Sequence, residues 1–549
     1  MESRGTRVLA VLAAILIGAG SVAYVLTRDD SDGDEPRGDP VDLVTDACRV
    51  DDELLRRVWR GYVPGSSEDI TLIPAAPNYS GNFAGPSHSG PWDYLQTVPF
   101  VLYGPQYIKA HETPLQEEVT LADFYPTVAE LLDIELPSRE GNSLDDSLIV
   151  SSDVPKVVVV VVWDGVGRNV LDRWPDAWPT LASLETAGTS YRRATVGSSP
   201  SITPATHSTL GTGTFPRTHG VTGIQYRNAA GEMDEAFLHM DPKVLGPPTF
   251  ADTVDAKLDN APKVGMLASH SWHLGMLGHG SQFDGGDDDQ VVLVGRVGLK
   301  TPDLRFYSHP DPIEPPEMST FIEAVDLLDG RLDDRWLQEK IIDPRDTPAL
   351  VNFQTEATIQ MLEQEGYGAD EVPDLFFVNF KTGDTIGHHF TMDSPQMEGV
   401  IKAQDEGLAD IVNYLDHAVG DYVVLLTADH GHTPSPERSE GWPIGNSEIA
   451  DDIDDHFDTP EGKSLVEESV AVGLFLDKAV MDELGIETSE IATWLNDYTI
   501  AKNWRETTLP KGYEDRGAER LFETVFVTED LPDIMRCAAP GEPGVAPED

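Results

Sequence analysis

Unbroken apolar runs recur along the chain without the polar alternation of a half-exposed strand. Residues 156–163 read KVVVVVVW, and shorter runs occupy residues 375–380 (LFFVNF) and 422–427 (YVVLLT). Such runs are typical of strands that are covered on both faces of a largely parallel sheet. Residues 98–103 (VPFVLY) are a further short candidate. The pattern predicts an α/β fold with the valine run at the centre of the sheet.

Other segments carry apolar residues at helical spacing. They predict helices over residues 119–134, 180–188, 319–328, 348–363, 395–419 and 489–495. A further helix is expected from Thr203, because Thr is a good N-cap and Pro204 is a good first helical residue. This would place the Thr203 hydroxyl at the positive end of the helix dipole.

The local composition of the sequence predicts how the chain is divided into regions. Residues 225–345 contain many Pro, Asp and Gly and no long periodic run, which indicates a cap or insertion that shapes substrate access. Core elements lie on both sides of it, in residues 151–224 and 346–549. Residues 41–150 form a separate N-terminal segment. The polar and acidic residues 29–40 predict a short disordered linker.

The N-terminus predicts export. Residues 8–26 carry no charge, follow Arg4 and Arg7, and precede an acidic stretch. That length just spans a bilayer, and the more basic side stays in the cytoplasm, so residues 1–28 are expected to be a signal anchor. The protein would then be a single-pass protein of the cell membrane with its catalytic part outside the cytoplasm. The small residues at 21–23 leave a cleaved signal peptide and a secreted protein as the alternative.

Charge and cysteine content indicate the partners and the cellular compartment that suit the protein. The chain has 96 acidic and 38 basic residues, a formal net charge of −58. This surface should not bind nucleic-acid polymers or anionic lipid non-specifically, and it suits a salt-rich setting. Outside the cytoplasm, the only two cysteines, Cys48 and Cys537, could form a disulfide that joins the two ends of the mature chain. The alternative is a pair of buried free thiols. The sequence does not set the oligomeric state.

Polar side chains follow the three long apolar runs. Asp164 follows the first, Asp384 and His388 follow the second, and Asp429 and His430 follow the third. The carboxyl ends of parallel strands meet at one edge of a sheet, so these groups should converge. Carboxylate and imidazole ligands suit zinc. One Asp-His pair alone is more often a cap or a solvated surface pair, but three such strand ends favour a metal site.

Four motifs, in this order, resemble the alkaline phosphatase superfamily. They are D-G after the valine run, S-x-T-P-x-x-H-x-x-L-x-T-G-x-x-P-x-x-H-G over residues 201–220, D-x-x-G-H over residues 384–388 and T-A-D-H-G over residues 427–431. Within that superfamily the chain is most similar to the type I phosphodiesterase/nucleotide pyrophosphatase group and to the threonine-nucleophile phosphatases near it. The resemblance implies a three-layer α/β sandwich with a mostly parallel central sheet.

The resemblance also implies a site with two zinc ions. Asp164, Asp429 and His430 would bind one ion together with the nucleophile Thr203, and the second would be bound by Asp384, His388 and one more histidine. The family takes that histidine from a segment downstream of D-H-G. Here a similar segment, GPSHSGPWDYLQTVPFVLYGP, stands upstream at residues 85–105. We therefore expect a circularly permuted arrangement in which His88 completes the second site, with His456 as the runner-up.

The function implied is hydrolysis of phosphate esters through a phosphothreonine, by a metal-dependent phosphodiesterase or phosphomonoesterase. Thr206 occupies a position where many diesterase relatives have an Asn that contacts a phosphoryl oxygen, so here the shorter hydroxyl makes this contact or the contact is lost. Lys381 lies close to the second-zinc ligands in sequence and could meet a phosphoryl oxygen, although a solvated lysine is the more common alternative. His207 and His219 match the family pattern and are expected to be structural. The alternatives are a membrane-anchored phosphotransferase with a non-water acceptor and a metal-binding pseudoenzyme. A sulfatase lacks support because no Cys or Ser stands at the nucleophile position, and the predicted export opposes a cytoplasmic mutase.

Overall fold

The computed structural model describes residues 42–545 except 152, 301–304 and 311. The predicted signal anchor and linker, residues 1–28 and 29–40, lie outside the described residues. Among the helices in the described ranges, none has the length and apolar character needed to cross a bilayer.

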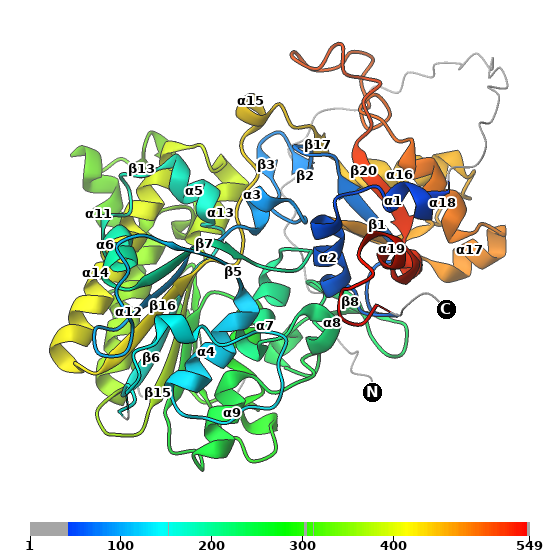
Figure 1. Ribbon diagram of the computed structural model, residues 1–549. Coiled ribbons are helices and arrows are strands. Elements are labelled where there is room, and N and C mark those ends of the chain that lie inside the picture. The colour runs from blue at the N-terminus through cyan, green and yellow to red at the C-terminus, as the bar shows by residue number, and fades with distance from the viewer. Residues whose placement is uncertain (1–41, 152, 301–304, 311, 546–549) are drawn as a thin grey trace, which may run out of the picture. The chain divides into compact units, whose positions relative to one another are not determined.

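The largest sheet in the described part of the chain has nine strands and is called the central sheet below (Figure 1). Its order is β12 (Gly298–Lys300), β11 (Gln290–Gly295), β10 (Val264–Ala268), β15 (Asp374–Phe380), β6 (Val157–Trp163), β16 (Tyr422–Thr427), β4 (Phe100–Tyr103), β7 (Thr189–Thr195) and β5 (Leu115–Thr120). The five strands from β11 to β16 run parallel, while β12 and β4 are antiparallel to their neighbours in this group. The prediction of an α/β fold with a mostly parallel sheet is confirmed.

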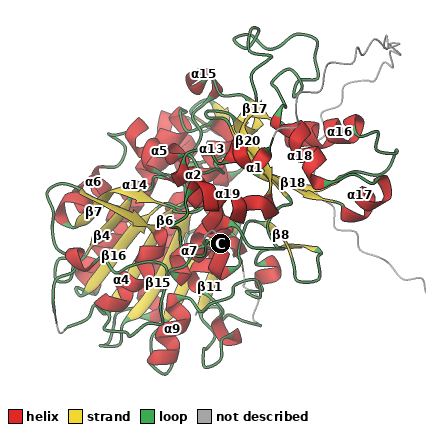
Figure 2. Cartoon of the chain, turned by 45° about the vertical axis from the view of Figure 1, so that its right-hand side comes forward, coloured by secondary structure: helices red, strands yellow, loops and turns green. Residues whose placement is uncertain are grey.

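The valine run divides its side chains between two hydrophobic cores. Val157, Val159 and Val161 belong to one core, and the alternate valines 158, 160 and 162 belong to the other. The first core includes residues of α5 (Arg168–Arg173), α6 (Pro179–Ala187), α11 (Met318–Asp326), α12 (Pro348–Glu365) and α14 (Pro395–Ala418). The second includes residues of α4 (Phe124–Leu131), α7 (Thr203–Thr212), α9 (Phe250–Lys257) and α10 (Leu274–Leu277). Helices therefore cover both faces of β6, which is why its sequence shows no alternation (Figure 2).

A second, four-stranded antiparallel sheet joins the two ends of the described chain. Its order is β18 (Val466–Val470), β19 (Gly473–Leu476), β1 (Ile70–Pro74) and β20 (Phe522–Val527). Its core includes side chains of α1 (Leu43–Ala47), α16 (Asn446–His456), α17 (Lys478–Leu484) and α18 (Thr488–Asn496). A neighbouring cluster joins α2 (Asp52–Gly61) to α19 (Leu531–Ala538). The first part of the N-terminal segment, up to β1, thus packs with the C-terminal region, while β4, β5 and α4 of the same segment belong to the nine-stranded sheet and its core.

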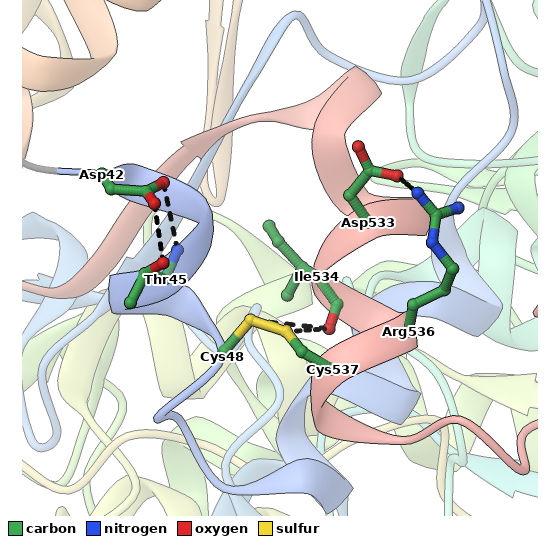
Figure 3. Close-up of a disulfide and its surroundings, with 7 residues drawn as sticks. All are labelled: Asp42, Thr45, Cys48, Asp533, Ile534, Arg536 and Cys537. Carbon is green, nitrogen blue, oxygen red and sulfur yellow. Dashed lines mark hydrogen bonds and ion pairs between the residues drawn. A yellow bond between two sulfur atoms is a disulfide. The ribbon is translucent and has the colours of Figure 1, made fainter. Parts of the chain in front are cut away.

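A disulfide links the same two regions. Cys48, the C-cap of α1, is bonded to Cys537 in α19, and their Cα atoms lie 5.9 Å apart (Figure 3). That separation is ordinary for a disulfide. The predicted pairing is confirmed, and the alternative of two free thiols is wrong.

The structure corrects the extent of two predicted regions. Residues 225–345 are not only a cap, because β10, β11 and β12 are strands of the central sheet. β10 reads VGMLA, which is too short and too glycine-containing to stand out as a buried run. The helix predicted over residues 119–134 is shorter than expected, because β5 takes residues up to Thr120 and α4 begins at Phe124.

Candidate active site

The carboxyl ends of β6, β15 and β16 place three predicted groups at one edge of the sheet. Asp164 follows β6, Lys381 follows β15 as the N-cap of α13 (Thr382–Phe390), and Asp429 stands two residues after β16. Gly165 allows the turn after β6 with a φ of 72°. Its backbone N–H donates to Asp429 Oδ1 at 2.9 Å, which connects two of the strand ends directly.

Lys381 lies between the carboxylates and the predicted nucleophile. Its Nζ is 2.8 Å from Asp164 Oδ1, 2.9 Å from Asp384 Oδ2 and 2.9 Å from Thr203 Oγ1. Burial alone would lower the pKa of Lys381, but Asp164, Asp384 and Asp429 raise it, so the side chain is an ammonium group. A protonated Lys381 donates to Thr203 Oγ1 and does not act as a base. The alternative of a solvated lysine is wrong, because the residue is 8% exposed.

Thr203 opens α7, as predicted, with a difference of one position. It is the first residue of the helix, Ile202 is the N-cap, and no side chain makes a capping hydrogen bond. The Thr203 hydroxyl therefore remains available to Lys381 instead of capping its own helix. Thr203 is 3% exposed and lies at the N-terminus of a ten-residue helix. The unsatisfied N–H groups and the dipole at that end favour negative charge.

Histidine side chains approach Asp384 from several elements. His88 lies between β3 (Gly85–Pro86) and α3 (Asp93–Gln96), and its Nε2 is 3.4 Å from Asp384 Oδ1. His388, one turn along α13, places Nε2 at 3.3 Å from the same oxygen. His430 Nε2 is 3.8 Å from it and 3.4 Å from Asp429 Oδ2. The rings of His88 and His430 are stacked with centroids 3.4 Å apart.

The tautomers of His88 and His430 suit metal binding. His88 Nδ1 is 2.9 Å from the Ser201 carbonyl oxygen, and His430 Nδ1 is 3.0 Å from the Gly431 carbonyl oxygen. A ring nitrogen next to a carbonyl must be the N–H donor, which leaves each Nε2 with its lone pair. Burial lowers the pKa of His430 to about 4, so its ring is neutral at neutral pH.

The acidic groups of the site differ in charge state. Burial alone would raise the pKa of Asp164 and Asp384, but Lys381 outweighs it and holds both pKa values below the ordinary range. Burial and the charge of Asp164 raise the pKa of Asp429 well above its usual value. Three buried carboxyl groups thus share one lysine, and for Asp429 that charge and the Gly165 N–H do not outweigh burial.

Several buried atoms in this cluster have no hydrogen-bond partner. They are Asp384 Oδ1, Asp429 Oδ2, His430 Nε2 and both ring nitrogens of His432. Buried polar atoms are costly unless they are paired. The ligand atoms of His88, Asp384 and His430 form one close group, and those of Asp164, Asp429 and His430 form another. Unpaired carboxylate and imidazole donors at this spacing fit divalent metal ions.

Three buried residues of the site were not predicted from the sequence. His273, shortly after β10, places Nε2 at 3.2 Å from Asp164 Oδ2, and Asn379 Nδ2 donates to the same oxygen at 3.0 Å. His432 places Nε2 at 3.6 Å from Asp384 Oδ1. The signal for His273 was its position just beyond a strand, but that strand itself was missed. His432 was visible beside D-H-G, but no motif singled it out.

Other predicted residues lie apart from the cluster. The Thr206 hydroxyl lies 3.1 Å from the carbonyl oxygens of Ile202 and Thr203, so it bonds to the backbone of its own helix turn. Its contact with substrate stays a prediction. His456, on α16, stacks on Trp494 and does not join the site.

His207 and His219 are held by local hydrogen bonds. His207 Nδ1 donates to the Thr203 carbonyl oxygen at 2.8 Å, and its Nε2 accepts from Asn379 Nδ2 at 3.0 Å. His219 Nδ1 accepts from the backbone N–H of Val221, and its Nε2 is 3.1 Å from Thr209 Oγ1. The structural role expected for both histidines stays a prediction, and ligand-type atoms of His207, Asp164 and His273 also form a close group.

A small cavity of about 120 Å³ adjoins the site. Its lining includes Ile202, which precedes Thr203, and Ser89, which follows His88. Glu68 also lines it, and burial raises the pKa of that carboxyl to about 7.

The family model of type I phosphodiesterase/nucleotide pyrophosphatase matches residues 158–536, more than half of the chain. The chain belongs to this family. The match begins inside β6 and ends in α19, so it includes Asp164, Thr203, Asp384 and Asp429. His88 and β4 precede it.

Individual relatives of the chain are distant or match it over short segments only. The chain is 31% identical over 96 residues to alkaline phosphatase PhoD of Zymomonas mobilis subsp. mobilis, and the aligned segment covers 18% of this chain and 17% of that protein. It is 34% identical over 101 residues to alkaline phosphatase PafA of Elizabethkingia meningoseptica, which covers 17% of this chain and 18% of the relative. The match thus spans less than a fifth of either relative. The crystal structure of wild-type PafA superposes with a TM-score of 0.48 at 16% identity, covering 69% of this chain and 85% of that one.

Proposed function

We propose that the protein is an exported hydrolase of phosphate esters that uses two zinc ions and acts through a phosphothreonine at Thr203. The observation that carries this is the position of Thr203 Oγ1, at the N-terminus of α7 and 2.9 Å from the Lys381 ammonium, among buried metal-type donors that have no partner. Membership of the phosphodiesterase family and the phosphatase names of the relatives point the same way.

The donor set supports two metal positions. Asp164, Asp429 and His430, with Thr203, would hold one ion, and Asp384, His388 and His88 would hold the other. His432 lies close enough to Asp384 to be a further ligand of the second. Zinc ions bound here would act as Lewis acids that stabilise negative charge on the attacking and leaving oxygens.

The protein groups have separable roles in the reaction. Thr203 Oγ1 loses its proton to solvent and attacks phosphorus as the P–O bond to the leaving group breaks. The leaving group departs as an alkoxide, which takes a proton from water. Lys381 and the N-terminal N–H groups of α7 stabilise the negative charge on Thr203 Oγ1 and on the phosphoryl oxygens. His273 and Asn379 hold Asp164 Oδ2, so the other oxygen of that carboxylate faces Lys381. Water then hydrolyses the phosphothreonine and releases phosphate.

The N-terminal position of His88 supports a circular permutation. The family match starts at residue 158, yet β4 pairs with β16 in the central sheet and His88 reaches Asp384. In this proposal a segment that most members carry after the D-H-G motif here precedes the first strand of the matched region. The disulfide between Cys48 and Cys537 is consistent with chain ends that lie together and with an oxidising compartment, whether the protein is anchored or secreted.

The proposal is tested by hydrolysis of p-nitrophenyl phosphate, bis-p-nitrophenyl phosphate and the p-nitrophenyl ester of thymidine 5′-monophosphate, in zinc and high salt. Thr203→Ala should lower kcat by at least about 10³-fold, while Thr203→Ser, which keeps a hydroxyl, should retain part of the activity. The preferred ester distinguishes a diesterase from a monoesterase.

The same assays separate the other candidate functions. Product transferred to an added alcohol in preference to water would favour a phosphotransferase. Stoichiometric zinc binding without turnover of any ester would favour a metal-binding pseudoenzyme and overturn the hydrolase.

A further inference from the structure

A second group of carboxylates lies away from the catalytic cluster. Asp255 belongs to α9, and Asp287 and Asp289 belong to the loop that leads into β11. One oxygen from each of these residues lies within 4.8 Å of the others. We call these three residues the remote carboxylate cluster.

Burial without partners sets this cluster apart from an ordinary acidic surface. Asp255 is 2% exposed and Asp289 is 3% exposed. Both carboxylate oxygens of Asp289 and the Oδ1 of Asp255 lack any hydrogen-bond partner. A carboxylate loses its hydration on burial, and leaving it unpaired costs several kcal/mol. The Asp255 and Asp289 side chains face each other, and a positive charge between them would compensate for the lost hydration.

The charged groups that act on Asp255 and Asp289 are all acidic. Besides burial, repulsion from Asp255, Asp252 and Asp287 raises the pKa of Asp289, and repulsion from Asp287 and Asp252 raises that of Asp255. Only the contact of the Asp255 carboxyl with that of Asp289, which requires a shared proton, lowers the pKa of Asp255. The nearby His279 is committed elsewhere, because its Nδ1 and its backbone N–H both bond to the Asp252 carboxylate at 2.8 Å. Asp252 is further satisfied by Thr249, so it is not a free ligand.

We propose that the remote carboxylate cluster binds one Ca²⁺ ion, which ties α9 to the loop before β11. Ligand oxygens that all lie within 4.8 Å of one another fit around an ion with Ca²⁺–O distances of about 2.3–2.6 Å. The donors are all carboxylate oxygens, which favour a hard cation and not the zinc that imidazole and carboxylate select together. Three carboxylates in flexible geometry suit Ca²⁺ better than Mg²⁺, which demands a regular octahedron.

The experiment uses the full chain, stripped of metal with EDTA, reloaded with zinc and held in 1 M KCl to screen its general acidity. CaCl₂ is then added while bound calcium is counted by equilibrium dialysis and the thermal midpoint is recorded. Asp289→Asn is compared with Asp288→Asn, because both remove one negative charge from adjacent residues and Asp288 lies outside the cluster. Asp287→Ala is a second test variant at an exposed position, so it does not disturb the core.

The wild type and Asp288→Asn should bind one Ca²⁺ more than Asp289→Asn, and saturating calcium should raise their Tm by about 2 to 4 °C. Asp289→Asn and Asp287→Ala should lose at least about tenfold in affinity for that ion and show little or no rise in Tm. An equal rise in the wild type and Asp289→Asn overturns the proposal. A wild type that binds no calcium also overturns the proposal. If Asp289→Asn then raises Tm without calcium, the Asp255 and Asp289 carboxyls share a proton in the wild type. A larger shift with MgCl₂ overturns the choice of Ca²⁺.

Discussion

Two groups of buried carboxyls in this protein are stabilised in different ways. In the active site, the Lys381 ammonium contacts Asp164 and Asp384 and holds the pKa of each below its ordinary range. In the remote carboxylate cluster, burial and the neighbouring acids raise the pKa of Asp255 to about 7 and that of Asp289 further. Whether a buried carboxyl is ionised thus depends on a cation within reach, which the chain itself supplies in one region and not in the other.

The donors of the two groups also differ in kind. The active site mixes carboxylate oxygens with the ring nitrogens of His88, His388 and His430, while the remote cluster offers oxygens alone. Mixed donors favour zinc, and oxygen donors favour calcium or magnesium. Under the two proposals, the active site and the remote carboxylate cluster would therefore select different cations by ligand chemistry.

Removing the lysine is the strongest test of this comparison. Lys381→Met keeps the length of the side chain and deletes the charge, so Thr203 Oγ1 and the phosphoryl oxygens lose a charged donor. We expect kcat/KM to fall by about 10³-fold, measured with the best of the three p-nitrophenyl esters. Lys402→Met, at an exposed lysine on α14, is the matched control. Unchanged activity in Lys381→Met would mean that the lysine only neutralises the carboxylates when metal is absent.

Removing a nitrogen donor is the next test. His88→Ala should lose one bound zinc equivalent and about 10²-fold in activity, because the second metal position keeps only Asp384 and His388 of its three proposed ligands. His456→Ala should keep both metal and activity, since that ring stacks on Trp494. Zinc content by atomic absorption and ester hydrolysis are the measurements. The reverse result, with His88→Ala intact and His456→Ala depleted, would refute the permuted site.

The disulfide tests whether either group depends on the joined chain ends. The double variant Cys48→Ala/Cys537→Ala removes a bond across 489 positions and should lower the free energy of unfolding by about 2 kcal/mol. The low end of the usual range is expected, because β1 still pairs with β20 and Arg60 still contacts Glu542. Urea unfolding measures the loss. If this variant bound less zinc or less calcium at 25 °C, metal binding at the active site or at the remote carboxylate cluster would depend on the disulfide.

Glu68 is a half-buried carboxyl outside both groups, and no lysine is among the groups that shift its pKa. Burial raises its pKa from 4.5 to about 7, so folding favours the neutral form. The associated stability is complete below about pH 4.5 and is lost as the pH rises through 7. Because the residue is partly exposed, we expect only about 1 kcal/mol between pH 5 and pH 8.

Urea unfolding at pH 5 and pH 8 measures this difference. Glu68→Gln should remove that part of the decline, whereas Glu117→Gln, on an exposed position of β5, should not. An equal pH dependence in wild type and Glu68→Gln would show that the carboxyl is ionised throughout.

The sequence predicted the parts of the site that depend on local pattern. Buried strands are recognised in the sequence as unbroken apolar runs, so Asp164 and Asp429 could be assigned to strand ends. The pair Thr203-Pro204 predicted the start of α7 to within one residue. β10 failed this test because its five residues include glycine, and His273 was lost with it. Lys381 was recognised only as a neighbour of Asp384, since nothing in its own segment shows that oxygen atoms of the distant Asp164 and Thr203 also contact its ammonium.

By itself, the sequence determined the α/β class, the central strand, the motifs of the family and the pair of cysteines. These follow from hydrophobic pattern and from residue types at short spacing, which local physics controls. Only the tertiary structure decided that His88 reaches Asp384, that Thr206 bonds to its own helix, and that Asp255 lies opposite Asp289. Such contacts join residues that are distant along the chain, or choose between two partners of one side chain, and packing makes that choice.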